Sequence, residues 1–174
     1  GMGLSVAGVI LQGVMNNALA SPNTIGVNSG AGFFVMLAMM LFPHSGYATS
    51  IASFVGALLT TLAIYALAYM ADSSRTTIIL AGITVFLNAG INTIKLINTD
   101  ITLNITSFLM GTLSGLTFNK IALPAIGIIA AVLVSFILAK PLNILSLGDD
   151  YARSLGLNVP LTRFFLLVLS SIMA

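Results

Sequence analysis

Long apolar stretches alternate with short polar ones along this chain. A helix needs about 20 residues to cross a hydrocarbon layer about 30 Å thick. The stretches are too continuous for the period-two alternation of barrel strands, so they predict spanning helices. We expect an all-α integral membrane protein, a polytopic helical bundle whose 174 residues form one partial transmembrane domain of a larger protein. The expected spans are residues 2–20, 30–43, 48–70, 77–97 and 121–139, with an incomplete one at 164–174.

One expected span carries a stripe of polar side chains. Thr84, Asn88, Asn92 and Lys95 recur at intervals of four, four and three residues, which places them on one helical face. Polar groups that face lipid are costly. The stripe therefore predicts either hydrogen bonds between helices or a face that lines a watery path. We favour the path-lining face for the whole stripe.

Composition supports a lipid environment and excludes several functions. The chain is 58% hydrophobic and 6% charged, whereas a soluble domain carries about 25% charged residues. A net charge of +2 without a basic run argues against nucleic-acid binding. There is no cysteine, and His44, beside Pro43 at a span boundary, is the single histidine. Disulfides and thiolate metal sites are therefore excluded, and we expect no metal and no cofactor.

The few basic side chains favour one orientation in the membrane. If the spans alternate, the connections 16–30, 71–76 and 140–163 share one side and 98–120 lies on the other. Positive charges prefer cytoplasmic loops, so we expect the first three connections in the cytoplasm. The residues counted are Arg75, Lys140, Arg153 and Arg163 on that side, against Lys95 and Lys120.

Two stretches between spans have unusual chemistry. Residues 16–32, NNALASPNTIGVNSGAG, are polar without a single charge. The segment SLGDDYARSLG, within residues 146–157, reads as a short amphipathic helix or, alternatively, a solvated loop. Acids at its start suit the helix dipole, and a glycine suits its end. Its helix would hold Asp149, Asp150 and Arg153, an apolar face of Tyr151, Ala152 and Leu155, and Gly156 as the stop.

Glycines four residues apart occur twice. The pairs are Gly26 with Gly30, and Gly111 with Gly115. This spacing lets helices approach closely in membranes. Alone it predicts packing, not function.

Three segments, in order, resemble one family. They are LQGVMNNALASPNTIGVNSGAG (11–32), ILAGITVFLNAGI (79–91) with FLMGTLSGLTFNKI (108–121), and AKPLNILSLGDDYARSLGLNVPLTR (139–163). Together they look like the FecCD family of ABC-transporter permeases, the type II importers for iron–siderophores, haem and cobalamin. Ala18 stands where the family usually has proline. The resemblance implies a subunit of about ten helices, of which this chain covers the second to part of the seventh.

The resemblance also implies partners and a mechanism. Two permease subunits, identical or paralogous, would form the pathway in a bacterial or archaeal inner membrane. A separate ATPase subunit would hydrolyse ATP, and an extracytoplasmic binding protein would deliver the cargo, so the chain itself is not an enzyme. Residues 104–119 would form a short, broken helix in the outer vestibule. The cytoplasmic gate would comprise Asn17, Leu19, Ser74 and Thr76, the pathway Thr84, Asn88 and Asn92, and the coupling element Asp149, Asp150, Tyr151, Ala152, Arg153, Leu155 and Gly156.

Two other classes were weighed. An intramembrane enzyme is disfavoured because no HExxH, GxSxG or Walker A sequence is present. Asp149 and Asp150 are adjacent, so on a helix they point in different directions. A secondary transporter, or another helical membrane protein with a polar pathway, is the stronger alternative. Many such transporters carry acids within their spans, and none is mid-span here.

Overall fold

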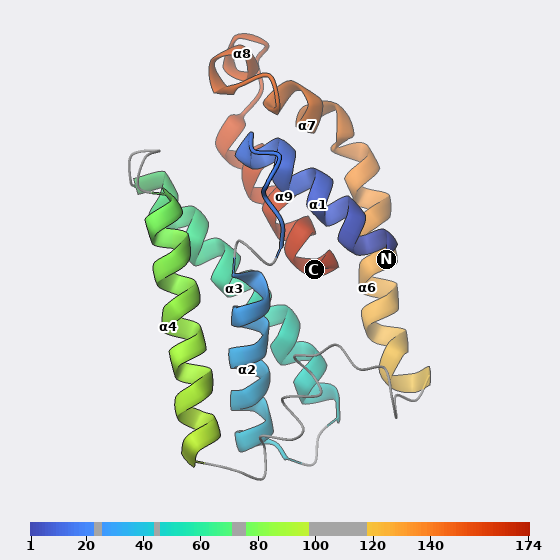
Figure 1. Ribbon diagram of the computed structural model, residues 1–174. Coiled ribbons are helices and arrows are strands. Elements are labelled where there is room, and N and C mark those ends of the chain that lie inside the picture. Colours follow the sequence, from blue (N-terminus) through green and yellow to red (C-terminus); the bar gives the residue numbers. More distant parts are fainter. Residues whose placement is uncertain (23–25, 44–45, 71–75, 98–117) are drawn as a thin grey trace.

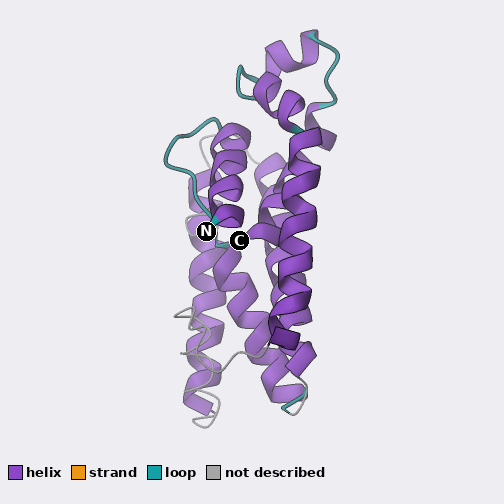
Figure 2. Ribbon diagram, turned by 90° about the vertical axis from the view of Figure 1, so that its right-hand side faces the viewer, coloured by secondary structure: helices purple, strands orange, loops and turns teal. Residues whose placement is uncertain are grey.

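The protein is a bundle of helices (Figure 1). The computed structural model describes residues 1–22, 26–43, 46–70, 76–97 and 118–174. These residues contain helices and no strand, as Figure 2 shows, so the expected all-α fold is confirmed. The helices are α1 (Met2–Met15), α2 (Val27–Leu41), α3 (Gly46–Met70), α4 (Thr76–Ile97), α6 (Phe118–Ile137), α7 (Ala139–Leu145), α8 (Asp149–Ser154) and α9 (Val159–Met173).

The helix α9 is the centre of the packing. It lies against α1, α3 and α6, while α2 packs on α3 and α4 as a second group. The helices α7 and α8, the end of α1 and the start of α4 lie toward the upper end of the bundle in Figure 1. The end of α4 and the start of α6 lie toward the lower end. One end of the bundle therefore holds α8, the end of α1 and the start of α4.

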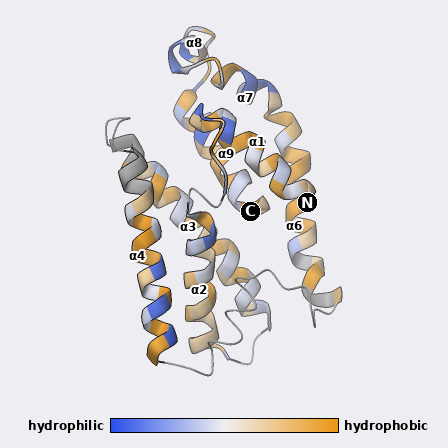
Figure 3. Ribbon diagram, in the orientation of Figure 1, coloured by the Kyte–Doolittle hydropathy of each residue, from blue (hydrophilic) through white to orange (hydrophobic). Residues whose placement is uncertain are grey.

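By length and composition, the described residues hold one helix able to cross a membrane, Tyr47–Leu67, with a mean hydropathy of 1.9. The pair Pro124–Ile137 and Ala139–Leu145 passes the same test together, but it is bent by 62°. The other apolar helices are shorter, at 10–17 residues. Large apolar side chains are nevertheless exposed along α4 and α6, among them Phe86 and Phe136. Figure 3 shows hydrophobic residues along both helices.

Three helix ends differ from the expected spans, each for a local reason. The helix α1 ends at Met15, not at residue 20, because Asn16 adopts the left-handed conformation and closes the helix on Gln12. The helix α9 begins at Val159, earlier than expected. There the side chain of Asn158 accepts the Leu161 N–H, which is N-capping. The third end, the break between α6 and α7, comes three residues before a proline.

Small residues set the closest helix contacts. A Cβ added to Gly30 of α2 would meet Thr60 Oγ1 and lie 2.9 Å from the carbonyl oxygen of Gly56 in α3. A Cβ added to Gly26, whose φ is +76°, would meet Thr84 Oγ1 of α4. Gly26 and Gly30 thus approach different helices, α4 and α3, and in this structure both glycines permit close helix packing.

Candidate gate and coupling segments

The chain after α1 forms a tight, hydrogen-bonded turn. The Asn17 N–H donates to the Gln12 carbonyl at 3.1 Å, and the Ala20 N–H donates to the Asn17 carbonyl at 3.1 Å. The Asn17 side chain accepts the Leu19 N–H at 2.9 Å, which is an Asx turn. The Gln12 side chain donates to the Ala18 carbonyl at 2.8 Å. Uncharged polar groups thus satisfy the backbone of this turn without help from charged residues.

The turn presents one large apolar side chain. Leu19 is 84% exposed, whereas the next residue, Ala20, is buried, and Pro22 is buried as well. Asn17 lies on the same turn and is exposed. Of the other expected gate residues, Ser74 lies outside the described residues, and Thr76 begins α4. The structure therefore brings Asn17 and Leu19 together on the turn that follows α1, and the end of α1 and the start of α4 lie toward the same end of the bundle (Figure 1).

The polar stripe of α4 divides in two. Thr84 is half-buried against Gly26 at the start of α2. Asn88 and Asn92 are exposed on this chain. Two neighbouring amide side chains on an exposed helix face can hydrate a path or bond to a second subunit. Their role in lining a pathway stays a prediction.

The predicted short amphipathic helix is α8. Asp149 and Asp150 occupy its first turn. At its end the Gly156 N–H donates to the Arg153 carbonyl and the Leu157 N–H donates to the Ala152 carbonyl, both at 3.0 Å. This is the Schellman arrangement, in which a left-handed glycine closes the helix; Gly156 has a φ of +79°.

The three apolar residues expected on one face of α8 lie on two sides of the helix. Tyr151 and Leu155 are 68% and 64% exposed, but Ala152 is 0% exposed. Ala152 belongs to the apolar core together with Leu145 and Val159. The reason is that α8 packs against α7 and α9, so its inward side is covered. The exposed residues on the other side are Asp150, Tyr151, Arg153, Ser154 and Leu155.

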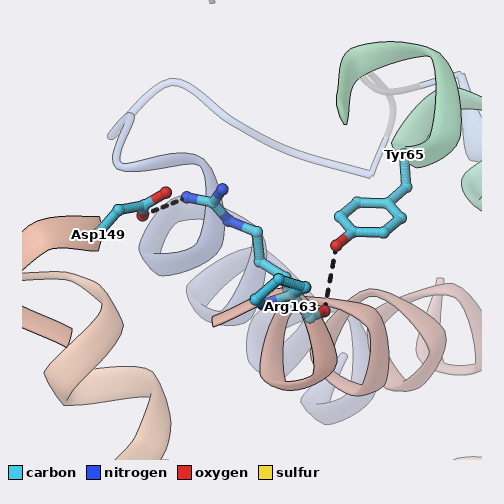
Figure 4. Close-up of polar contacts among 4 residues, drawn as sticks. Tyr65, Asp149 and Arg163 are labelled. Carbon is cyan, nitrogen blue, oxygen red and sulfur yellow. Dashed lines mark hydrogen bonds and ion pairs between the residues drawn. The ribbon is translucent and has the colours of Figure 1, made fainter. Parts of the chain in front are cut away.

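One polar contact ties α8 to α9, and a second ties α3 to the start of α9 (Figure 4). The guanidinium of Arg163 in α9 pairs with Asp149 of α8 at 2.8 Å. The Tyr65 hydroxyl of α3 donates to the Pro160 carbonyl at the start of α9 at 3.1 Å. Sequence reasoning missed both contacts. Within the described ranges, no three His, Cys, Asp or Glu side chains gather as metal ligands.

Comparison with known proteins gives consistent matches. The model of the FecCD transport family matches residues 1–174. The chain is 33% identical over 177 residues to the ferric enterobactin transport system permease protein FepG of Escherichia coli (strain K12), covering 99% of this chain and 53% of that protein. It is 30% identical over 181 residues to the hemin transport system permease protein HmuU of Yersinia pestis, covering 99% and 54%.

Two further matches cover the same extent. One is the cobalamin import system permease protein BtuC of Halobacterium salinarum, 31% identical over 177 residues, covering 99% of this chain and 47% of that one. The other is a solved structure, an inward-facing conformation of a metal-chelate type ABC transporter, with a TM-score of 0.86 at 25% identity, covering 98% of this chain and 56% of that chain. The chain thus spans about half the length of the curated relatives it matches.

Proposed function

The chain belongs to the FecCD transport family, and from this premise we propose that it is part of the membrane-spanning permease subunit of an ATP-driven importer. The cargo is an iron chelate, such as a siderophore or haem, or cobalamin. Relatives named for ferric enterobactin, hemin and cobalamin support this range of cargo. A binding protein delivers the cargo from outside the cytoplasmic membrane, and a separate ATPase subunit supplies the energy.

The observation that carries this proposal is the position of α8. It is a short helix that lies at one end of the bundle (Figure 1) and exposes charged and apolar side chains together. A mixed surface of this kind suits a groove on a partner protein. Docking of the ATPase on Tyr151, Arg153 and Leu155 moves α8, and the pair between Asp149 and Arg163 passes that movement to α9.

The turn that carries Leu19 forms the gate in this proposal. Two permease subunits face each other, and a pair of Leu19 side chains seals the pathway by contact and dewetting. An uncharged turn allows this closure because no like charges are buried together. Asn17, Ser74 and Thr76 complete the gate, and Thr84, Asn88 and Asn92 line the route beyond it. The helix α9 packs on both α1 and α3, which links the coupling segment to both sides of the gate.

The test uses the full-length permease with its ATPase and binding protein in proteoliposomes. Uptake of a ferric siderophore, haem and cobalamin is measured with ATP, with ADP, and with an imposed proton or sodium gradient. We expect ATP-dependent uptake of one cargo class. Uptake driven by an ion gradient alone would contradict the proposal and favour a secondary transporter.

A second measurement locates the gate. Leu19→Ala removes the sealing side chain, so passive leak of the cargo without ATP should rise above that of the wild type. Leu19→Cys in both subunits should cross-link in at least one nucleotide state. Absence of cross-links in every state, together with an unchanged leak for Leu19→Ala, would remove Leu19 from the gate.

A further inference from the structure

We propose that Gln12 is the positioning residue of the turn that carries Leu19, an inference that rests on the gate function proposed above. Gln12 lies in the last turn of α1 and is exposed. Its carbonyl accepts the N–H groups of Asn16 and Asn17. Its side-chain amide reaches forward to the Ala18 carbonyl at 2.8 Å. One residue thus holds the turn through both its backbone and its side chain.

The bond to Ala18 holds the central peptide of the turn. The contact from the Ala20 N–H to the Asn17 carbonyl defines a β-turn, with Ala18 and Leu19 as its central residues. The two common turn types differ by a flip of the peptide between those residues. The Ala18 carbonyl belongs to that peptide, so its bond to Gln12 opposes the flip. The direction of the Leu19 side chain follows, because this peptide leads directly into Leu19.

Besides Gln12, the Asn17 side chain holds the same peptide by accepting the Leu19 N–H, but the Leu19 side chain itself has little restraint. It is 84% exposed, so core packing does not hold it. Ala18 occupies the second position of the turn, where proline would preset the backbone φ. Without other restraints, a turn with alanine at this position has more accessible conformations than one with proline. The hydrogen bond from the Gln12 amide selects one of them. Proline at position 18 should therefore make Gln12 less necessary.

The chemistry of the amide offers a near-isosteric test. An ionised Glu has almost the same shape but only accepts hydrogen bonds, so Gln12→Glu places an acceptor against the Ala18 carbonyl. Gln12→Met keeps the length and removes the polar group. Since Gln12 lies outside the apolar core formed by Ile10, Leu11 and Val14, both variants should fold. Their melting temperatures should match the wild type, which separates positioning from general stability.

The experiment measures the gate in the full-length transporter with its ATPase. Passive leak of the transported chelate is followed in proteoliposomes without ATP, and cross-linking of Leu19→Cys is followed in the same backgrounds. We expect Gln12→Glu and Gln12→Met to raise leak about 2- to 10-fold, the factor by which one net hydrogen bond shifts an equilibrium. Adding Ala18→Pro to either variant should return leak to near the wild-type level.

The control is Ser5→Ala, which removes another exposed polar group of α1. The Ser5 hydroxyl donates to the carbonyl of Gly1, the N-cap of α1, far along the helix from the turn, so leak should not change. If Leu19→Ala leaks while both Gln12 variants behave like the wild type, the gate stands and the role of Gln12 is refuted. A leak in the Gln12 variants that Ala18→Pro fails to reduce also refutes positioning through this turn. If Leu19→Ala does not leak, the proposed gate itself is wrong.

Discussion

Arg163 at the start of α9 donates a hydrogen bond to Asp149 at the start of α8, across 2.8 Å. Both side chains remain partly exposed to solvent. Pairs of this kind contribute about 0.2–1 kcal/mol to stability. The contact therefore does little for the stability of the bundle. It joins the first turn of α8, a helix of only six residues, to α9, in addition to the packing of Ala152 in the core.

Breaking this pair should uncouple transport more than it unfolds the protein. Arg163→Gln and Asp149→Asn should each lower ATP-driven uptake several-fold, with a melting temperature within a few degrees of the wild type. The reversed pair, Asp149→Arg with Arg163→Asp, should restore part of the uptake. Restoration is incomplete because a cation at a helix N-terminus opposes the dipole. Uptake is measured in proteoliposomes at low and high salt, since salt screens exposed pairs.

Lys140→Gln is the matched control for the loss of a positive charge. Lys140 is exposed on α7 and makes no ion pair within the part of the chain described. Its replacement should leave uptake unchanged. An equal loss in Lys140→Gln and Arg163→Gln would show that net charge, and not the pair, matters.

Substitutions in α8 should separate the buried side from the exposed side. Ala152→Glu places a charge in the core, where an unpaired carboxylate is costly, so it should lower the melting temperature and the yield. Tyr151→Ala with Leu155→Ala removes only exposed apolar groups. That variant should keep its melting temperature and bind the ATPase more weakly in pull-down. Weak binding with normal stability in Ala152→Glu would reverse this assignment of faces.

The bounds of α8 could be predicted from sequence because their causes are local. Acids in the first turn and a glycine after the last are signals that a short segment carries by itself. The burial of Ala152 was not predictable in this way, because it depends on how α7 and α9 cover one side of the helix. The pair between Tyr65 and Pro160 joins residues 95 positions apart, and no local pattern encodes such a contact.

The break between α6 and α7 could have been predicted from a proline, although hydropathy alone does not indicate it. Residues 121–139 form a continuous apolar run, so hydropathy indicates one span. Pro141 has no N–H to donate to the Ile137 carbonyl, and its ring would clash with that carbonyl in a continuous helix. The helix ends at Ile137, and the chain bends by 62° before α7. Hydropathy locates apolar segments, while backbone chemistry decides where they bend.

The contact between α2 and α3 should not tolerate a methyl group. Gly30→Ala brings a Cβ against Thr60 and the Gly56 carbonyl, and such overpacking typically costs about 1–3 kcal/mol. Gly8→Ala in α1 is the control, because a Cβ there meets nothing within 4 Å. It should be neutral or stabilising by about 0.5–1 kcal/mol, since Ala favours helices over Gly. Thermal unfolding of both variants in detergent gives the comparison; similar melting temperatures would contradict the close approach.

The two ends of the bundle should lie on opposite sides of the membrane. The helix α8 lies at one end and the start of α6 at the other, in both Figure 1 and Figure 2. Asp150 is exposed on α8, and Phe118 at the start of α6 is 90% exposed. The chain has no cysteine of its own, so Asp150→Cys and Phe118→Cys each introduce a single reporter.

In the full-length protein, kept otherwise free of cysteine, an impermeant maleimide applied to intact spheroplasts should label Phe118→Cys and spare Asp150→Cys. Inverted membrane vesicles should give the opposite result. The proposed function places α8 and the turn at Leu19 on the side of the ATPase, and positive charges such as Lys140 and Arg153 favour the cytoplasm there. Permeabilised cells, in which both sites should react, control for accessibility. Labelling of both cysteines from the same side would overturn this topology and, with it, the assignment of α8 to the ATPase.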